Sequence, residues 1–210
     1  MPRKNRGYKR DEPHRDARFF VIVCEGAKTE KEYFDFFDRL TQRLKFRILP
    51  PENDASAPRY SLSRAIEYEE DFGLTNRDQL WFVLDVYRWG EALRRMNEEC
   101  NKHTNWHLAI SNPCFEVWLL MHFRDVTKKD TNGTACEPFK KALRRQPDGY
   151  KAEKAAFRIE EAIQRAKTSD ADPDHFMPNL PGTKLYQLAE QMLEYMGQEW
   201  ERVKQSGKES

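Results

Sequence analysis

The sequence predicts an α/β domain, in which a mostly parallel sheet of about four strands is flanked by helices and followed by a helical C-terminal part. Two observations support this fold class. Four short segments rich in β-branched and aromatic residues alternate with helical patterns, which is typical of parallel strands joined by crossover helices. Beyond residue 125 only helical periodicities remain. At 210 residues, the chain is long enough to bury one substantial core.

The chain is predicted to consist of a short tail and one domain. Residues 1–18 carry seven Arg or Lys side chains against three acids and almost no apolar residue, so we expect a flexible basic tail. The domain is predicted over residues 19–205, with an α/β core at 19–125 and a helical extension at 126–205. A tail of this composition is more often a solvated terminus than a phosphate-binding segment.

Composition and cysteine spacing predict a cytoplasmic protein. The 36 basic and 35 acidic side chains nearly cancel, so net charge alone does not predict nucleic-acid binding. The four cysteines lie far apart without a C-x-x-C pair, which favours reduced thiols over a disulfide or zinc framework. No apolar segment approaches the roughly 18 residues that span a membrane, and the N-terminus is polar where a signal peptide would be apolar. We therefore expect no membrane partner.

The first predicted strand, Phe19–Cys24, ends on a carboxylate. Its continuous apolar run is typical of a strand covered on both faces. Gly26 favours a turn, and the spacing of Thr29 and Glu32 predicts a capping box at the start of a helix. Glu25 should therefore lie in a strand-to-helix turn, where open α/β sheets bind ligands. The alternative is that Glu25 only caps a neighbouring loop. The apolar face of the helix is formed by Tyr33, Phe36, Phe37, Leu40 and Leu44.

The next two strands lead to a second carboxylate in the same kind of position. Phe46–Leu49 is followed by a Pro-rich loop at 50–60 and a short helix at about 61–72. The strand Leu80–Leu84 then ends on Asp85. If the first and third strands are neighbours, about 4.8 Å apart, Glu25 and Asp85 can converge on one cation.

A third acid is predicted near the fourth strand, Trp106–Ile110, which follows a helix at about 93–100. Asn112 and Pro113 fit the N-cap and first position of a helix. That helix is apolar almost all round except for Glu116, which should be buried and paired, because burying a lone carboxylate costs more than a helix N-terminus returns. His122 lies about 120° around the helix from Glu116, so the two should not share a ligand.

The remaining residues predict helices with structural roles. Small residues between 152 and 166 and apolar residues between 185 and 203 form two stripes, the second behind Thr183 as a predicted N-cap. Asp170, Asp172 and Asp174 alternate as in a calcium loop, but the glycine and glutamate that such a loop requires are missing. We therefore do not predict calcium binding.

Three motifs make the sequence similar to a known family. The segments VIVCEGAKTEKEYF, FVLD and SNPCFEVWLLMHF resemble the RloB-like family, whose members are related to the Toprim fold and are encoded in prokaryotic restriction and phage-defence loci. PGTKLYQLAEQ near the end is similar to the family's late Thr-containing helix start. The resemblance covers most of the chain and implies a Toprim-like sheet.

The resemblance also implies a metal site. Toprim-type enzymes hold Mg²⁺ at a phosphodiester with a glutamate after the first strand and an Asp-x-Asp after a later strand, which map onto Glu25 and Asp85 here. Mg²⁺ or Mn²⁺ would then be the cofactor, with Glu116 as a further ligand or base and Lys28 binding a neighbouring phosphate. The sequence departs from the pattern at Tyr87, where the second aspartate is expected. One or two carboxylates with waters and substrate phosphates can still hold Mg²⁺.

Two functions follow from the resemblance as expectations. The first is a metal-dependent nuclease subunit that cleaves nucleic acid in antiphage defence together with an ATPase partner. The alternative is a Toprim-like sensing or scaffold subunit with a degenerate metal site. DNA versus RNA, the trigger and self-association into a homo-oligomer stay open. A P-loop is excluded because Val21 stands where its first glycine is required, and no G-x-G-x-x-G predicts dinucleotide binding.

Overall fold

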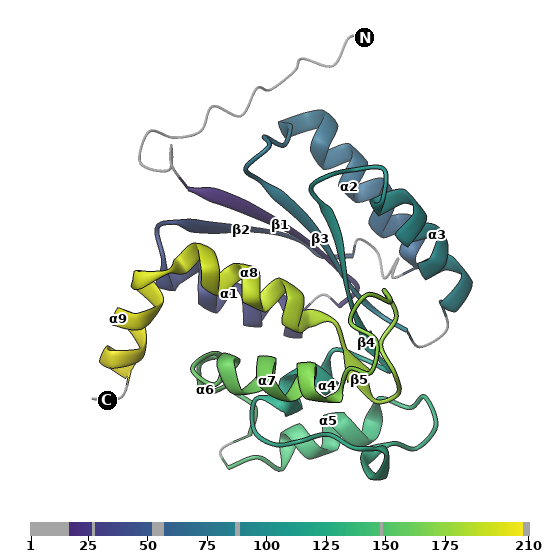
Figure 1. Cartoon of the computed structure of the whole chain (residues 1–210), viewed down its shortest axis with the longest axis vertical. Helices are drawn as coiled ribbons and strands as arrows, with labels where there is room; N and C mark the ends of the chain where they lie inside the picture. Colours follow the sequence, from purple (N-terminus) through teal and green to yellow (C-terminus); the bar gives the residue numbers. More distant parts are fainter. Residues whose placement is uncertain (1–16, 27, 52–56, 87–88, 148, 208–210) are drawn as a thin grey trace.

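The fold is taken from a computed structural model that describes residues 17–26, 28–51, 57–86, 89–147 and 149–207 (Figure 1). All but the last two positions of the predicted basic tail therefore lie outside the described residues. Within these ranges no helix combines the length and apolar character needed to cross a membrane.

The centre of the molecule is a five-stranded sheet in the order β2-β1-β3-β4-β5. The strands are β1 (Arg18–Cys24), β2 (Leu44–Leu49), β3 (Gln79–Asp85), β4 (Trp106–Asn112) and β5 (Gly182–Thr183). The first four are parallel, and β5 pairs antiparallel with the end of β4. The predicted α/β fold with a mostly parallel sheet is confirmed, with one more strand than expected.

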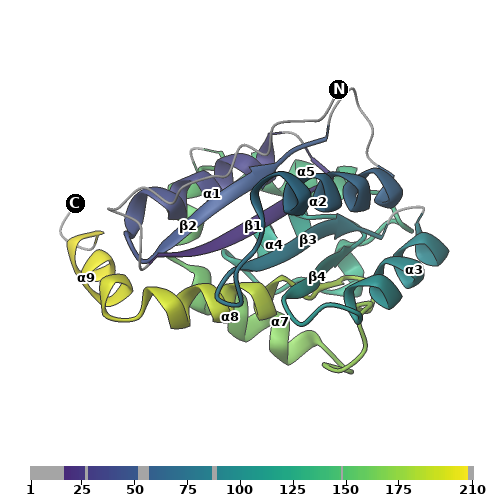
Figure 2. The ribbon, with the colours of Figure 1, turned by 90° about the horizontal axis from the view of Figure 1, so that it is seen from above.

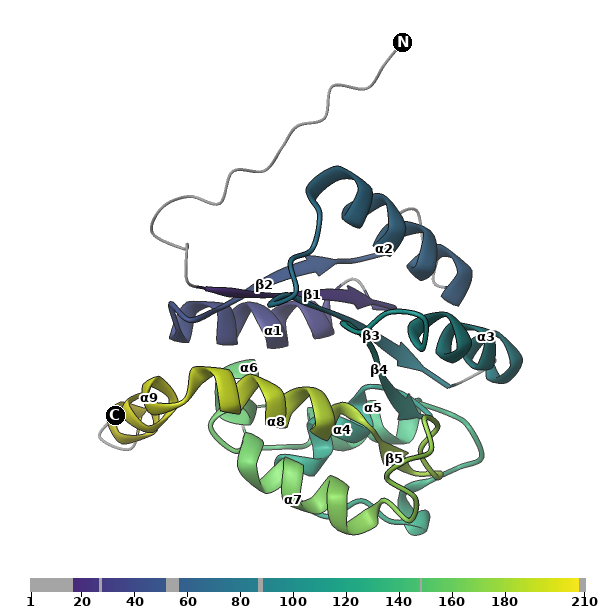
Figure 3. The ribbon, with the colours of Figure 1, turned by 45° about the horizontal axis from the view of Figure 1, so that its top comes forward.

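Helices cover both faces of the sheet (Figure 3). One face carries α2 (Pro58–Phe72) and α3 (Gly90–Cys100), and the other carries α1 (Thr29–Leu40) and α8 (Leu185–Met196). Seen from above, α8 runs along the sheet from the β4 side towards β2 (Figure 2). On this same side, α7 (Ile159–Ser169) packs against α8, and α6 (Ala152–Ala156) packs against α1. α4 (Glu116–Met121) lies against α7 and α5 (Glu137–Arg144), and α9 (Gln198–Gly207) follows α8.

Alternation along the strands builds two separate cores. In β1, Phe20 and Ile22 pack towards α1 and the C-terminal helices, whereas Val21 and Val23 pack towards α2 and α3. All four side chains are fully buried. A strand covered on both faces needs apolar residues at every position, which explains the continuous apolar run in the sequence.

Three local predictions about helix starts and ends within residues 19–125 are wrong. Thr29 is the first residue of α1, which has no side-chain cap, so the capping box does not form. Leu44 begins β2 instead of extending the apolar face of α1. Asn112 stays in β4, where it pairs with Gly182, and α4 begins only at Glu116.

The C-terminal extension is helical, as predicted. Thr183 lies in β5 rather than at the N-cap, which is Lys184, although the Thr183 hydroxyl accepts a hydrogen bond from the Leu185 N–H at 3.1 Å. The Asp-rich connection binds a lysine, since Asp170 forms a buried salt bridge with Lys184. Its side chains therefore hold the start of α8 in place.

Candidate functional site

Glu25 and Asp85 lie at the carboxyl ends of two neighbouring parallel strands. In the register of β1 and β3, Cys24 is opposite Val83, and the Glu25 N–H donates to the Val83 carbonyl at 3.1 Å. The Asp85 N–H donates to Glu25 Oε2 at 3.0 Å. The sequence prediction that these two residues come together on adjacent strands is therefore confirmed.

The Glu25 carboxylate is held on both of its oxygens. Besides the Asp85 amide, the indole Nε1 of Trp89 donates to Oε1 at 3.3 Å. Burial nevertheless raises the pKa of Glu25, and these two hydrogen bonds oppose the rise only in part. Glu25 thus accepts from the last residue of β3 and from the Trp89 side chain, and its carboxylate is poorly solvated.

Asp85 joins the strand end to the turn before α4. Its Oδ1 accepts a hydrogen bond from the Phe115 N–H at 2.8 Å. The pKa of Asp85 is raised well above its usual range, first by burial of the carboxyl and then by the charges of Glu25, Glu30 and Glu116. Three neighbouring acids therefore raise the pKa of Asp85, which shows that its carboxyl group lies in a negative electrostatic potential.

Glu116 faces this cluster from the first turn of α4. Its side chain is 14% exposed, and its carboxylate lies 3.8 Å from the ammonium group of Lys140. The prediction that Glu116 is buried and paired is confirmed. Because the Lys140 side chain is 46% exposed, the ion pair contributes no more than about 1 kcal/mol. Lys140 supplies a single positive charge, so it can compensate at most one of the acids.

The sequence analysis missed a fourth acid, Glu30. Its side chain is only 6% exposed, and its Oε1 accepts a hydrogen bond from the Gly26 N–H at 3.0 Å. Burial, followed by the charges of Glu116 and Glu25, raises the pKa of Glu30 to about 7. A signal was present in the sequence, because Glu30 shares the buried face of α1 with Tyr33, Phe34 and Phe37 at helical spacing.

The glycine after Glu25 leaves space for the carboxylate group of Glu30. A Cβ atom added to Gly26 would collide with the carboxylate group of Glu30. The E-G pair in the first motif therefore places one carboxylate at the strand end and leaves room for a second.

Two thiols border the acids and were also missed. The thiol of Cys114 is hydrogen-bonded to Cys136, which lowers the pKa of Cys136 and raises that of Cys114. The charge of Cys136 acts on Asp85, so this pair adjoins the carboxylates. Cys114 lies in the third motif but was not predicted to take part in chemistry, and Cys136 lies outside all the motifs.

The remaining predicted site residues are not in the cluster. Lys28 is exposed at the N-cap of α1, and no described contact joins its ammonium group to the acids. Tyr87 lies outside the described residues. His122 is buried behind α4, where its Nε2 lies 3.1 Å from the Tyr33 hydroxyl and its Nδ1 lies 2.9 Å from the Trp118 carbonyl. Both ring nitrogens of His122 are therefore engaged by protein groups.

The donor set is suited to a hard divalent cation. Carboxylate oxygens are the ligands that Mg²⁺ and Mn²⁺ prefer, and a cation would compensate the mutual repulsion of Glu25, Glu30, Asp85 and Glu116. Among the described residues, no group of three or more acidic, histidine or cysteine side chains is already arranged around one point as a metal site. The observed arrangement therefore fits an ion held by one or two carboxylates, with waters and substrate completing its shell.

A cavity of about 580 Å³ opens between α2 and α3 beside these acids. Trp89, which donates to Glu25, forms part of its wall together with Leu62 and Met96. Arg59 and Arg95 also line it, together with Glu91 and Glu99. The cavity thus combines an aromatic ring and aliphatic side chains with two guanidinium groups and two carboxylates next to the strand ends.

Comparison with known proteins identifies one match. A family model described as RloB-like protein matches residues 20–192, which include most of β1, all of β2 to β5, the four acids and most of α8. No curated protein and no solved structure matches the chain.

Proposed function

Since the chain belongs to the RloB-like family, and since four acids gather where its sheet ends, we propose that it is a metal-dependent nuclease subunit acting on phosphodiester bonds in antiphage defence. The observation that carries the proposal is the close electrostatic coupling of Glu25, Glu30, Asp85 and Glu116 at the carboxyl ends of β1 and β3. Uncompensated acids of this kind are more common at functional sites than elsewhere.

In this proposal Glu25 and Asp85 hold Mg²⁺ or Mn²⁺, and Glu116 is a further ligand or a base. The bound ion would supply charge neutralisation of the scissile phosphate and acidification of a water molecule. Asp85 and Glu25 are preorganised for this role by the hydrogen bonds from Phe115, Asp85 and Trp89 that fix their carboxylates. Lys28, at the start of α1, binds a neighbouring phosphate as the substrate approaches.

The cavity beside Trp89 supports a nucleic-acid substrate. Aromatic rings and arginines are the side chains on which unpaired bases stack, and arginines also pair with phosphates. Arg59 and Arg95 share the lining with Glu91 and Glu99, so the support for a nucleic-acid substrate is the combination of ring and guanidinium groups and not a net positive charge. By its resemblance to the family, the subunit works with an ATPase partner.

The experiment that tests the proposal is a cleavage assay with labelled DNA and RNA, with and without Mg²⁺ or Mn²⁺. We expect metal-dependent cleavage by the purified protein together with its partner. Glu25→Gln should reduce it at least about a hundredfold, which corresponds to about 3 kcal/mol of lost electrostatic stabilisation. Glu67→Gln, an exposed acid on α2, is the matched control and should cleave normally. Equal cleavage by both variants would refute the role of Glu25.

A sensing or scaffold subunit is the second candidate function. It is favoured by Tyr87 in place of the second aspartate and by the lack of a formed three-ligand group among the described residues. In that case Glu25→Gln and Asp85→Asn would each leave phage protection intact.

A further inference from the structure

One edge of the sheet is only partly covered. β4 pairs with β3 along its whole length, but β5 pairs only with Ser111 and Asn112. After Lys184 donates to the Ile110 carbonyl at 2.7 Å, the chain turns away into α8. Within the described ranges, the first part of β4, from Trp106 to Leu108, therefore has no strand on its outer side.

The backbone of Leu108 points out of this edge. Adjacent residues of a strand alternate in the side to which their N–H and C=O groups point. The carbonyls of Asn105 and Ser111 face β3, and that of Ile110 faces β5. By this alternation the N–H and C=O groups of Leu108 face outward, on the same side of β4 as the Ile110 carbonyl that accepts from Lys184.

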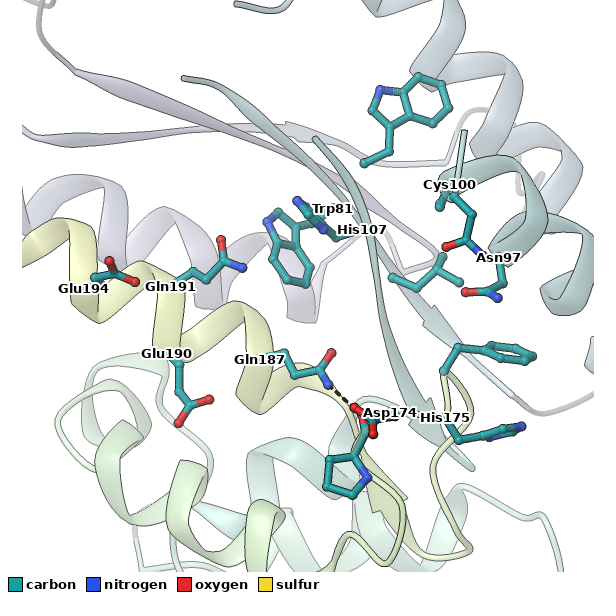
Figure 4. Close-up of a pocket in the computed structure, with 15 residues that line it drawn as sticks. Trp81, Asn97, Cys100, His107, Asp174, His175, Gln187, Glu190, Gln191 and Glu194 are labelled. Atoms are coloured by element: carbon teal, nitrogen blue, oxygen red, sulfur yellow. Dashed lines mark hydrogen bonds between the residues drawn. The ribbon is translucent and has the colours of Figure 1, made fainter. Parts of the chain in front are cut away.

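A cavity of about 530 Å³ surrounds this edge (Figure 4). Gln187 and Gln191 of α8 form one wall, with Trp81 and His107 at its floor, and Asn97 of α3 faces them across the edge. The Pro173–Phe176 connection closes the outer side, held by the Gln187 amide, which donates to the Pro173 carbonyl at 3.2 Å. The space therefore lies where one more short strand would run.

Two buried polar atoms in this lining have no partner among the described residues. They are the Nε1 of Trp106 and the Nε2 of His107. Both atoms are enclosed by the protein itself, so the argument for an occupant rests on the outward-facing backbone groups of Leu108 and on the charge of the lining.

The charge of the cavity selects a cationic occupant. Asp174, Glu190 and Glu194 line it, and no Lys or Arg is among the described lining residues. Lys167 pairs with Glu190 at 2.6 Å, which leaves Asp174 and Glu194 as the main source of negative potential. A phosphate backbone would be repelled here, whereas lysine or arginine side chains would be attracted.

We propose that this cavity binds an extended, basic peptide segment of a partner protein, which adds a strand to β4 in continuation of β5. Pairing with Trp106–Leu108 takes about three residues, or roughly 10 Å of extended chain. Main-chain hydrogen bonds to Leu108 would give affinity, and Gln187, Gln191, Asp174 and Glu194 would contact the side chains. The site lies at the opposite end of β4 from the acids near Asp85, so a bound peptide leaves those acids accessible.

The test measures fluorescence anisotropy of a labelled peptide that alternates lysine with valine. We expect binding by the full chain that weakens with salt, and at least tenfold weaker binding of the matched peptide that alternates glutamate with valine. Leu108→Pro should reduce binding at least tenfold, because it removes an N–H that faces away from β3 and so spares the existing ladder. Leu108→Val keeps that N–H and is the matched control.

A second variant protects the test against a folding defect. Gln191→Trp fills the cavity from α8 without changing β4, and it should also weaken binding at least tenfold while the melting temperature is retained. Glu194→Gln should weaken it several-fold, whereas Glu67→Gln on α2 should not. Undetectable binding, equal binding of both peptides, or full binding by Gln191→Trp would overturn the proposal. Self-association of the chain that Leu108→Pro abolishes would overturn it too, by assigning the edge to a second copy.

Discussion

At the scale of single residues, the acids at the strand ends should make the metal-free protein less stable as pH rises. The pKa of Glu30 is about 7 in the folded chain against an ordinary value of 4.5, so the folded state binds more protons than the unfolded state between these values. The contribution of Glu30 to the free energy of unfolding is fully present below about pH 4.5 and is lost as the pH rises through 7. Glu25 and Asp85, whose pKa values are also raised, act in the same direction.

Glu30→Gln should flatten this pH dependence. The variant keeps an oxygen for the Gly26 N–H but cannot ionise, so its loss of unfolding free energy between pH 5 and pH 7.5 should be smaller, by up to about 3 kcal/mol. Urea denaturation without metal at the two pH values measures the difference. Glu32→Gln, exposed on the same helix, is the control and should follow the original protein. Identical slopes for Glu30→Gln and the original protein would contradict the prediction.

Gly26 and Glu30 should show strong energetic coupling. We expect Gly26→Ala to destabilise the fold by about 1–3 kcal/mol, because the new methyl group meets the buried Glu30 carboxylate. The same change in a Glu30→Ala background should cost much less. A double-mutant cycle from urea denaturation gives the coupling energy. Additive effects of the two changes would show that Gly26 is present for another reason.

At the scale of elements, the sequence predicted the strands well and the local contacts less well. β1 and β3 could be recognised because both faces are buried, and that pattern also located Glu25 and Asp85 at their ends. β5 is only two residues long, too short for any periodicity to indicate it. Asn112 resembled a helix cap, but pairing with Gly182 keeps it extended. Glu30 was missed because a charge on an apolar helix face appears as an irregularity until its surroundings are known.

Helix α4 should make the protein sensitive to acid through His122. This ring is fully buried between Tyr33 and Trp118, and burial lowers its pKa to about 3 from 6.5. The unfolded state then binds more protons between these values, so stability falls as pH falls from 6.5 towards 3. His122→Gln should remove this contribution, at some cost at neutral pH. Urea denaturation of both proteins at pH 7 and pH 4.5 should show that the free energy of unfolding decreases less for the variant than for the original protein.

At the scale of the whole molecule, the sheet separates two surfaces. The acids lie at the carboxyl ends of β1 and β3, and the open edge of β4 lies towards the other end of the strands. The cavity beside Trp89 has balanced charges, because Glu91 and Glu99 line it together with Arg59 and Arg95, whereas the cavity at the edge is lined by acids without a Lys or Arg among its described lining residues. A basic partner segment would therefore be attracted to the edge of β4 rather than to the cavity beside Trp89.

Divalent cations should raise the melting temperature of the original protein, and this shift should require an intact acidic cluster. A ligand that binds the folded state stabilises it by mass action, so Mg²⁺ or Mn²⁺ should shift melting of the original chain but not of Glu25→Gln or Asp85→Asn. Without metal, both variants should melt slightly higher than the original protein, because each removes one of several repelling charges while an oxygen remains for the hydrogen bonds of Asp85 and Phe115. Thermal melts with and without the ions measure both effects.

Phage protection then distinguishes catalysis from scaffolding. If the cluster is catalytic, Glu25→Gln and Asp85→Asn lose protection by orders of magnitude with the fold intact; if the protein is a scaffold, both keep it and no ion shifts melting. Tyr87→Asp tests the departure from the Toprim pattern. A second aspartate should strengthen the ion-dependent shift if the site is only weakened by the tyrosine, because β3 already brings Asp85 beside Glu25. No gain in the shift would mean that position 87 does not reach the ion, and the nuclease reading would then depend on Glu116 and Glu30 to complete the site.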